Sequence, residues 1–143
     1  MDYSLQSLTT VADCNVLLSM AAKEKADLNF RKLSAERTTA RFSETATSLA
    51  ADLQGVMIEI AATETIINVL PDGPSKEDAI DKKTRLEYRK FTLETRIASY
   101  GITALLEKEM DLGRILREID EADVFTAAVE TRIGELSSVV VTD

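Results

Sequence analysis

Apolar residues recur along this chain at a spacing of seven, and the pattern continues through both halves of the sequence. The first line in the first half is Cys14, Ala21, Leu28, Ala35, Phe42, Leu49, Val56, Thr63 and Leu70. The second line is Val11, Leu18, Lys25, Lys32, Thr39, Ala46, Leu53, Ile60 and Ile67. The second half has Phe91, Ala98, Leu105, Leu112, Ile119, Thr126, Ile133 and Val140, accompanied by Ile115, Ala122, Val129 and Leu136. A step of seven held this long is typical of a coiled coil or a long helical bundle.

One segment near the midpoint, NVLPDGPSKED, interrupts the helical pattern and holds both prolines of the chain. Pro71 cannot continue a helix, and it pushes Leu70 out of the helical region. Ser75, with Asp78 three residues later, has the pattern of a helix N-cap. We therefore predict a single helical domain over residues 1–143, with a helix over about 8–70, a turn at 71–75 and a helix over about 76–138.

A chain that turns at about residue 72 places residue i near residue 145 minus i. Large residues then face small ones, with Phe42 opposite Gly101 and Phe91 opposite Gly55, as close packing requires. The expected charge pairs are Lys25 with Glu118, Lys32 with Asp111, Arg37 with Glu107, Glu59 with Arg85 and Glu64 with Lys82. Each exposed pair contributes only about 0–1 kcal/mol, so these pairs indicate register and are no source of stability. The sequence thus predicts a long antiparallel, coiled-coil-like helical hairpin.

A two-helix hairpin buries one narrow stripe on each helix, and this sequence is apolar beyond that stripe. Near the turn, Met57, Ile58, Ile66 and Val69 lie off the main line. Far from the turn the same holds for Val16, Leu17, Met20, Ala22, Val124, Phe125, Ala127 and Ala128. A helix that is apolar on several faces is buried on several faces. We therefore expect a homodimer in which two hairpins form a four-helix bundle.

The alternative architecture is a compact monomeric four-helix bundle. The segment Arg37–Ser48 is a poor helix former, and Tyr100 and Gly101 lie opposite it. Breaks in both helices at this level would let the hairpin fold in half. The unbroken step of seven through Ala35, Phe42 and Leu49 favours the long hairpin, because a loop normally resets the phase.

Composition and charge exclude several classes of function. The net charge is −8, so nucleic acid and anionic membranes are poor default partners. No histidine is present, which removes the commonest general base and metal ligand. No apolar run is long enough to span a bilayer, and the start of the chain lacks the features of a secretory signal. With Cys14 as the single cysteine, we expect a cytoplasmic protein.

The residues that could carry chemistry all have a simpler structural interpretation. Cys14 lies on the helical seam, where a buried structural cysteine is usual. Lys25 and Lys32 lie at the seam edge, where the side-chain stem packs and the charged head stays in water beside carboxylates. Thr39, Thr63 and Thr126 are polar gaps in the seam whose hydroxyls can bond to their own helix.

Two clusters of charge also lack a functional pattern. The acidic cluster is Glu107, Glu109, Asp111, Glu118, Asp120, Glu121 and Asp123, and it has no calcium-binding loop around it. The basic group is Lys82, Lys83, Arg85, Arg89 and Lys90, mixed with acidic residues. No glycine-rich phosphate loop, paired cysteines or nucleophile elbow is present. We therefore predict no catalytic, cofactor-binding or metal-binding residues.

The sequence favours a non-enzymatic structural or adaptor protein that acts through helical protein–protein contacts, because it has surplus apolar faces and no catalytic constellation. The alternatives are a helical bundle that binds a small molecule or lipid in its interior, which would need convergent polar groups, and an acidic secretion-type chaperone. The chaperone alternative rests on size, charge and helical character alone.

Overall fold

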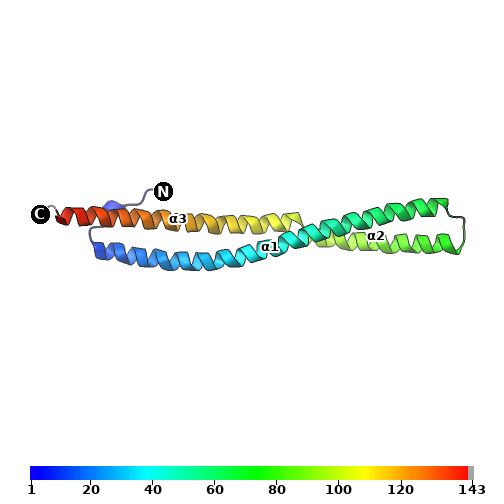
Figure 1. Cartoon of the computed structure of the whole chain (residues 1–143), viewed down its shortest axis with the longest axis horizontal. Helices are drawn as coiled ribbons and strands as arrows, with labels where there is room; N and C mark the ends of the chain where they lie inside the picture. Colours follow the sequence, from blue (N-terminus) through cyan, green and yellow to red (C-terminus); the bar gives the residue numbers. More distant parts are fainter. Residues whose placement is uncertain (142–143) are drawn as a thin grey trace. The chain divides into compact units, whose positions relative to one another are not determined.

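The computed structural model describes the backbone of residues 1–141 and the side chains of residues 1–138. Within these residues the chain is all-helical (Figure 1), which confirms the predicted class and the long helices. The elements are the short 3-10 helix η1 (Leu5–Ser7), α1 (Val11–Val69), α2 (Pro74–Tyr100) and α3 (Ile102–Val141). The side chain of Val140, a predicted seam residue, and positions 142–143 of the predicted domain lie outside the described set.

Helix α1 begins three residues later than predicted because the preceding segment has other partners. The backbone N–H of Asp13 donates to Oγ1 of Thr10 at 3.2 Å, so Thr10 caps the helix. The carbonyl oxygen of Leu8 accepts a hydrogen bond from Nε of Arg132 at 3.0 Å. Leu8 is therefore tied to α3 and does not belong to α1.

The turn lies where the prolines predict it, but its capping residue differs. The backbone N–H of Leu70 donates to the carbonyl oxygen of Ile66 at 3.1 Å, and α1 ends before Pro71. Gly73, with φ of 153°, has the left-handed backbone that favours glycine, and it is the N-cap of α2. The predicted cap at Ser75 is wrong, because Pro74 already occupies the first helical position, for which its fixed φ is suited.

The chain divides into two helical units. The first unit is formed by Met1–Arg37 together with the chain from Met110, and the second unit is Thr38–Glu109. In the first unit Lys25 pairs with Asp123 at 2.6 Å and Arg31 pairs with Glu118 at 3.8 Å. Since the residue number rises along α1 as it falls along α3, the helices of the first unit are antiparallel.

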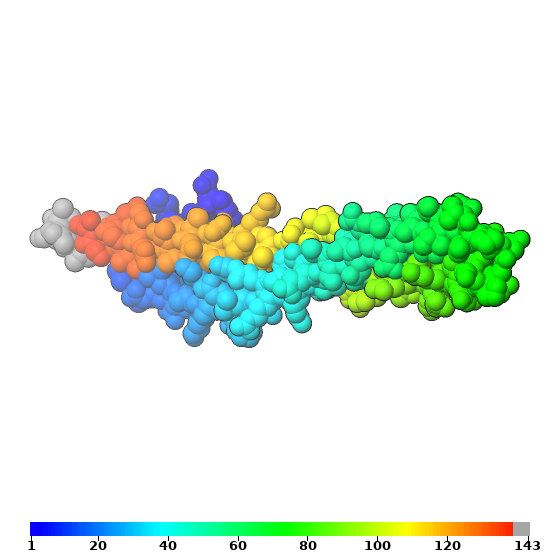
Figure 2. All heavy atoms as spheres, turned by 45° about the vertical axis from the view of Figure 1, so that its right-hand side comes forward, coloured from blue at the N-terminus to red at the C-terminus, as the bar shows by residue number. Residues whose placement is uncertain are grey.

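The second unit is likewise an antiparallel helix pair, and it has a small apolar core. Leu49, Val56, Leu86 and Leu93 form one buried cluster between α1 and α2, and Leu53, Ile60 and Ile97 pack at its edge. Figures 1 and 2 show α1 and α2 side by side along this unit. Each fully buried Leu or Val contributes about 1.5–3 kcal/mol, so this line holds the pair together.

The two predicted lines of α1 differ in burial. In the first line the exposed fraction is 4% or less for Cys14, Ala21, Leu28, Leu49, Val56 and Thr63. In the second line all positions from Leu18 to Ile67 are half-buried, and Val11 is exposed. The first line is therefore the centre of the helix contact, and the second line runs along its edge.

The predicted line of the second half is wrong in α2. Phe91 is 65% exposed and Ala98 is also exposed, whereas Leu86 and Leu93 are buried. A step of seven from Leu86 and Leu93 would continue at position 100. The corresponding line of α3 is one residue later than position 100. It includes position 101, just before the helix, and positions 108, 115, 122, 129 and 136, all buried or half-buried. One extra residue therefore separates the repeat of α2 from that of α3.

Gly101 accommodates this extra residue by leaving the helical conformation. Its φ and ψ are −86° and −154°, so the backbone is extended there, and α2 ends and α3 begins on either side. A Cβ atom at position 101 would press against the carbonyl oxygen of Ile97 and lie 2.9 Å from its Cγ2 atom. Of the two breaks required by the alternative architecture, the one at Tyr100–Gly101 is present, whereas α1 continues unbroken through Arg37–Ser48.

The predicted register is approximately right, but the individual partners are not. Lys25 pairs with Asp123 instead of Glu118, and Lys32 is 3.9 Å from Glu36 on its own helix. Glu64 pairs with Lys83, one residue from the predicted Lys82. Phe42 lies beside Tyr100, with ring centroids 6.3 Å apart.

The predicted contact between Gly55 and Phe91 is wrong, because a Cβ atom at Gly55 would meet nothing within 4 Å. The one-residue offset in α2 explains this, since it turns Phe91 away from α1.

The substitution Gly101→Ala tests the break between α2 and α3. We expect it to lower the free energy of unfolding by about 1–3 kcal/mol, because the methyl group overlaps backbone atoms that cannot move without shifting the helix. Urea denaturation followed by circular dichroism measures this value. Gly134→Ala is the matched control, since a Cβ atom there meets nothing within 4 Å, and it should raise stability by about 0.5–1 kcal/mol. Equal effects of the two substitutions would contradict the role given to Gly101.

Candidate interaction surface

The residues predicted to have structural roles on the seam are buried or paired within the helices. Cys14 is fully buried, and its thiol forms no disulfide. The side chain of Lys25 is 44% exposed beside Asp123, so its charge lies in water next to a carboxylate. Thr63 is 3% exposed, and its hydroxyl donates to the carbonyl oxygen of Glu59 at 2.8 Å. The Thr63 hydroxyl is therefore satisfied within α1.

The predicted acidic cluster does not converge on one point. Its seven carboxylates are all exposed. In the first unit, Asp123, Glu118 and Asp111 each lie within salt-bridge distance of a different basic residue, namely Lys25, Arg31 and Arg114. Among the residues that the structure describes, no three acidic or thiol groups lie close enough to hold a metal ion.

The predicted basic group is divided between two sides of α2. Lys83 and Lys90 are half-buried toward α1, and each lies near a carboxylate four residues on, Glu87 at 3.8 Å and Glu94 at 3.9 Å. Lys82, Arg85 and Arg89 are exposed. The five charges therefore form no single positive patch of the kind that binds phosphate groups.

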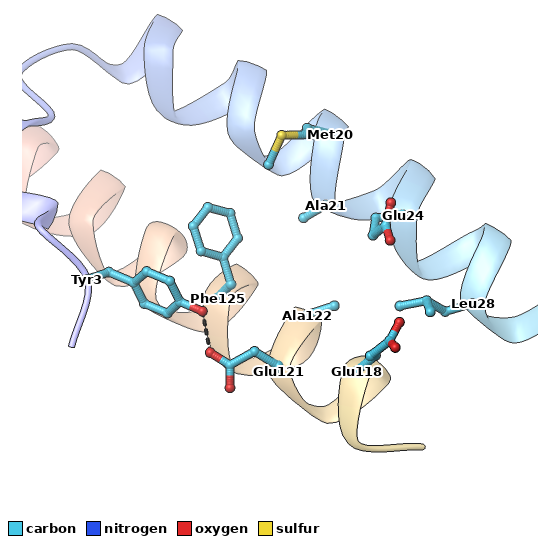
Figure 3. A pocket seen from close by; sticks show the side chains of 9 residues that line it. All are labelled: Tyr3, Met20, Ala21, Glu24, Leu28, Glu118, Glu121, Ala122 and Phe125. Carbon is cyan, nitrogen blue, oxygen red and sulfur yellow. Dashed lines mark hydrogen bonds between the residues drawn. The ribbon is translucent and has the colours of Figure 1, made fainter. Parts of the chain in front are cut away.

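A groove of about 280 Å³ lies in the first unit, between the N-terminal segment, α1 and α3 (Figure 3). Its floor is apolar and is formed by Met20, Ala21, Leu28, Ala122 and Phe125. Three carboxylates, those of Glu24, Glu118 and Glu121, belong to its lining. The groove thus combines an apolar floor with negative charge.

Tyr3 closes one side of this groove. Its ring meets the ring of Phe125 edge to face, with centroids 5.1 Å apart, and its hydroxyl donates to the carboxylate of Glu121 (Figure 3). This hydrogen bond raises the pKa of Tyr3, with smaller contributions from desolvation and from the negative charge of Glu121. Together with the bond from Arg132 to Leu8, the contact holds the N-terminal segment against α3.

A second groove, of about 470 Å³, follows α1 in the second unit. It is lined by Ala50, Leu53, Gln54, Met57, Ile58 and Ala61 of α1 and by Ile97 of α2. None of these residues carries a charge. Met57 and Ile58 are 49% and 63% exposed, so large apolar side chains face solvent along the groove.

Other large apolar residues of the second unit are exposed outside the groove lining. Ile66 and Val69 are 50% and 76% exposed on the last turns of α1. From Ala50 to Val69 the only charged residues are Asp52, Glu59 and Glu64. We call the six groove residues of α1 the groove strip. Most of the outer surface of this part of α1, and all of the groove strip, is uncharged.

The fold and its surfaces define an all-helical protein whose most distinctive surface feature is an exposed apolar strip on a long helix. Comparison with protein-family models, with curated proteins and with solved structures finds no match for this chain. Within the described part of the chain, no helix has the combined length and apolar character that crossing a bilayer requires.

Sequence reasoning missed two parts of these surfaces. The buried line of α2 could have been found from Leu86 and Leu93, which are seven residues apart, but extending the line of α3 backwards obscured it. The packing of Tyr3 against Phe125 and Glu121 has no periodic signal, because the N-terminal segment is not part of a regular helix contact.

The substitution Glu121→Gln tests the hydrogen bond of Tyr3. We expect it to lower the pKa of Tyr3 toward the ordinary tyrosine value, because the neutral amide removes both the charged acceptor and its repulsion of the phenolate. Nuclear magnetic resonance titration of the Tyr3 ring carbons measures this pKa. Since the raised pKa belongs to the folded protein, the contact should persist below it and be lost as pH rises through it.

Glu24→Gln is the matched control, because Glu24 lines the same groove without contributing to the pKa of Tyr3. The same titration curve for the wild-type protein and for Glu121→Gln would show that Glu121 is not the acceptor in solution.

Proposed function

We propose that this chain is a non-enzymatic structural or adaptor protein that acts through helix–helix contacts with other protein chains. The observation that carries the proposal is the half-exposed second line of α1 together with the uncharged groove strip beside it. Exposed apolar surface of this kind costs free energy in water, at about 25 cal/mol per Å². A contiguous patch of it is typical of protein interaction sites.

The second line of α1 changes character along the helix, which supports the second unit as the contact site. In the first unit the line carries Lys25 and Lys32, whose charges favour water. In the second unit the same line carries Leu53, Ile60 and Ile67, which are half-buried. A helix of another chain laid along this part of α1 would complete the burial that α2 leaves unfinished.

A second copy of the chain is the simplest occupant, because two helix pairs stacked on these faces form a four-helix bundle that buries the groove strips of both copies. An export substrate held by an acidic chaperone would use the same face. The self-association of the purified protein distinguishes these cases, because it needs no other protein.

The substitution Met57→Glu tests the contact. We expect the wild-type protein to have twice the 15.7 kDa mass of one chain. We expect Met57→Glu to raise the dissociation constant by about 100-fold, because it places an unpaired charge in an apolar contact. Light scattering after size-exclusion chromatography measures the masses over a range of concentrations.

Leu33→Glu is the matched control, since Leu33 is 55% exposed on the part of α1 that belongs to the first unit. It should leave the mass unchanged. A wild-type mass of one chain at every concentration would argue against self-association.

A second candidate function is small-molecule binding in the groove of the first unit. The apolar floor and the carboxylate of Glu24 favour a small organic cation with an apolar body, since Glu118 and Glu121 already lie beside Arg31 and Tyr3. We expect hexylammonium to raise the midpoint of thermal unfolding by a few degrees and hexanoate to leave it unchanged. Thermal-shift measurement of both probes, repeated with Glu24→Gln, checks this candidate. Equal shifts with both probes would contradict binding by charge.

A further inference from the structure

The positions of the groove strip have the same spacing in both directions along α1, with an alanine at each end. Its six residues, numbered 50, 53, 54, 57, 58 and 61, are spaced by three, one, three, one and three. The centre of this arrangement lies between Gly55 and Val56. A strip with such a centre can pack against an antiparallel copy of itself, because each position then meets a defined partner and the contact is two-fold symmetric.

We propose that the second unit binds a second copy of this chain through a two-fold contact in which the groove strip of α1 packs antiparallel on the same strip of the copy. The inference rests on the proposed function and specifies its contact. Ala50 then meets Ala61 of the second copy, Leu53 meets Ile58, and Gln54 meets Met57. The larger pairs lie next to the two-fold axis and fill the space on either side of it, and the two Ala50–Ala61 pairs lie at the ends of the contact.

Helix α2 carries a charge pattern that fits the same symmetry. Lys83, Glu87, Lys90 and Glu94 alternate in sign, and the salt bridges Lys83–Glu87 and Lys90–Glu94 show that they share one side of the helix. Lys83 also contacts Glu64 at 3.3 Å, and Ile97, seven residues after Lys90, lines the groove. The four charges therefore lie on the side of α2 that borders the groove.

Against an antiparallel copy of α2, this pattern pairs only opposite charges. Lys83 faces Glu94 of the second copy, and Glu87 faces Lys90. The centre of this second pattern lies between Tyr88 and Arg89. If the pattern were shifted by one helical turn, like charges would meet, so the charges select one register.

The two centres lie at the same level of the second unit. Position 42 of α1 lies beside position 100, and position 64 lies beside position 83. Interpolation between these contacts places the level of Gly55 and Val56 at about residue 89 or 90 of α2. That level is within about one residue of the centre of the charge pattern, so one two-fold axis perpendicular to the helices satisfies both α1 and α2.

The acidic residues of α1 do not oppose this contact. Asp52 and Glu59 are exposed and are not part of the groove lining, so they lie on the other side of α1. Glu64 is within salt-bridge distance of Lys83. The second copy of α1 therefore meets an uncharged surface, and the charged residues of α2 flank it.

The size of the contact fits a dimer that dissociates on dilution. Two helix faces of about 30 Å by about 10 Å provide about 600 Å² per copy, at the lower end of specific interfaces. The dimer should therefore be present at high protein concentration and decrease at low concentration, which makes changes in affinity measurable in both directions.

Cross-linking tests the position of the axis. Measured along the helix direction, Met57 lies about 4.5 Å from Met57 of the second copy, because three residues at 1.5 Å each separate them. We expect Met57→Cys to give a covalent dimer with a short thiol-to-thiol cross-linker. Gly55→Cys is the matched control. Position 55 is closer than Met57 to the two-fold axis but lies outside the groove, so this variant should form no covalent dimer. The wild-type protein controls for Cys14, which is fully buried.

Charge exchange tests the pairing of α2. Glu87→Lys and Lys90→Glu should each raise the dissociation constant by about tenfold, because each places like charges opposite one another at two symmetric sites. The double variant should return it to within about threefold of the wild-type value. Arg89→Glu is the matched control, because Arg89 is not part of the row formed by Lys83, Glu87, Lys90 and Glu94. Adding Glu87→Lys to Arg89→Glu should not restore the wild-type dissociation constant.

The outcomes separate this inference from the function on which it rests. Cross-linking at position 57 and not at 55, with recovery in the double variant, supports the two-fold contact. A dimer that cross-links equally at both positions, or shows no recovery, overturns the contact and leaves the proposed function standing. A wild-type protein that stays a single chain at all concentrations overturns the two-fold contact together with self-association.

Discussion

The packing of one helix against a single neighbour limits how much apolar surface each can bury, and this limit governs the structure of the chain. In α1 six of the eight central-line positions from Cys14 to Thr63 are nearly fully buried, while the line four residues away stays half-exposed. Helix pairing alone therefore stabilises each unit through one column of side chains. The half-exposed line is the origin of the surface properties described above, because it carries Lys25 and Lys32 in the first unit and Leu53, Ile60 and Ile67 in the second.

The sequence could predict α1 well because its repeat has one phase from beginning to end. Pro71 and Gly73 fix the turn through backbone restrictions that are local and strong. The second half could not be predicted as well, because a pattern read backwards from α3 arrives in α2 one residue out of phase. Gly101 marks the offset, but a lone glycine in a helical sequence does not reveal whether the helix continues through it.

Only part of the candidate interaction surface could be predicted from the sequence. Met57, Ile58, Ile66 and Val69 are recognisable as surplus apolar residues from spacing alone. Their relation to Ile97, and therefore the groove, depends on which side of α2 meets α1. The individual ion pairs also needed coordinates, because long side chains reach partners up to one helical turn from the position directly opposite, as Lys25 does in reaching Asp123. Charge patterns fix register more coarsely than apolar packing does.

The extended residue at position 101 sets the phase between the seven-residue repeats of α2 and α3. Insertions and deletions inside paired helices shift every later side chain around the helix, unless they come in multiples of seven. Gly101 absorbs a shift of one residue at a single point. Removing that residue would leave the buried positions of α2 and α3 in one uninterrupted repeat.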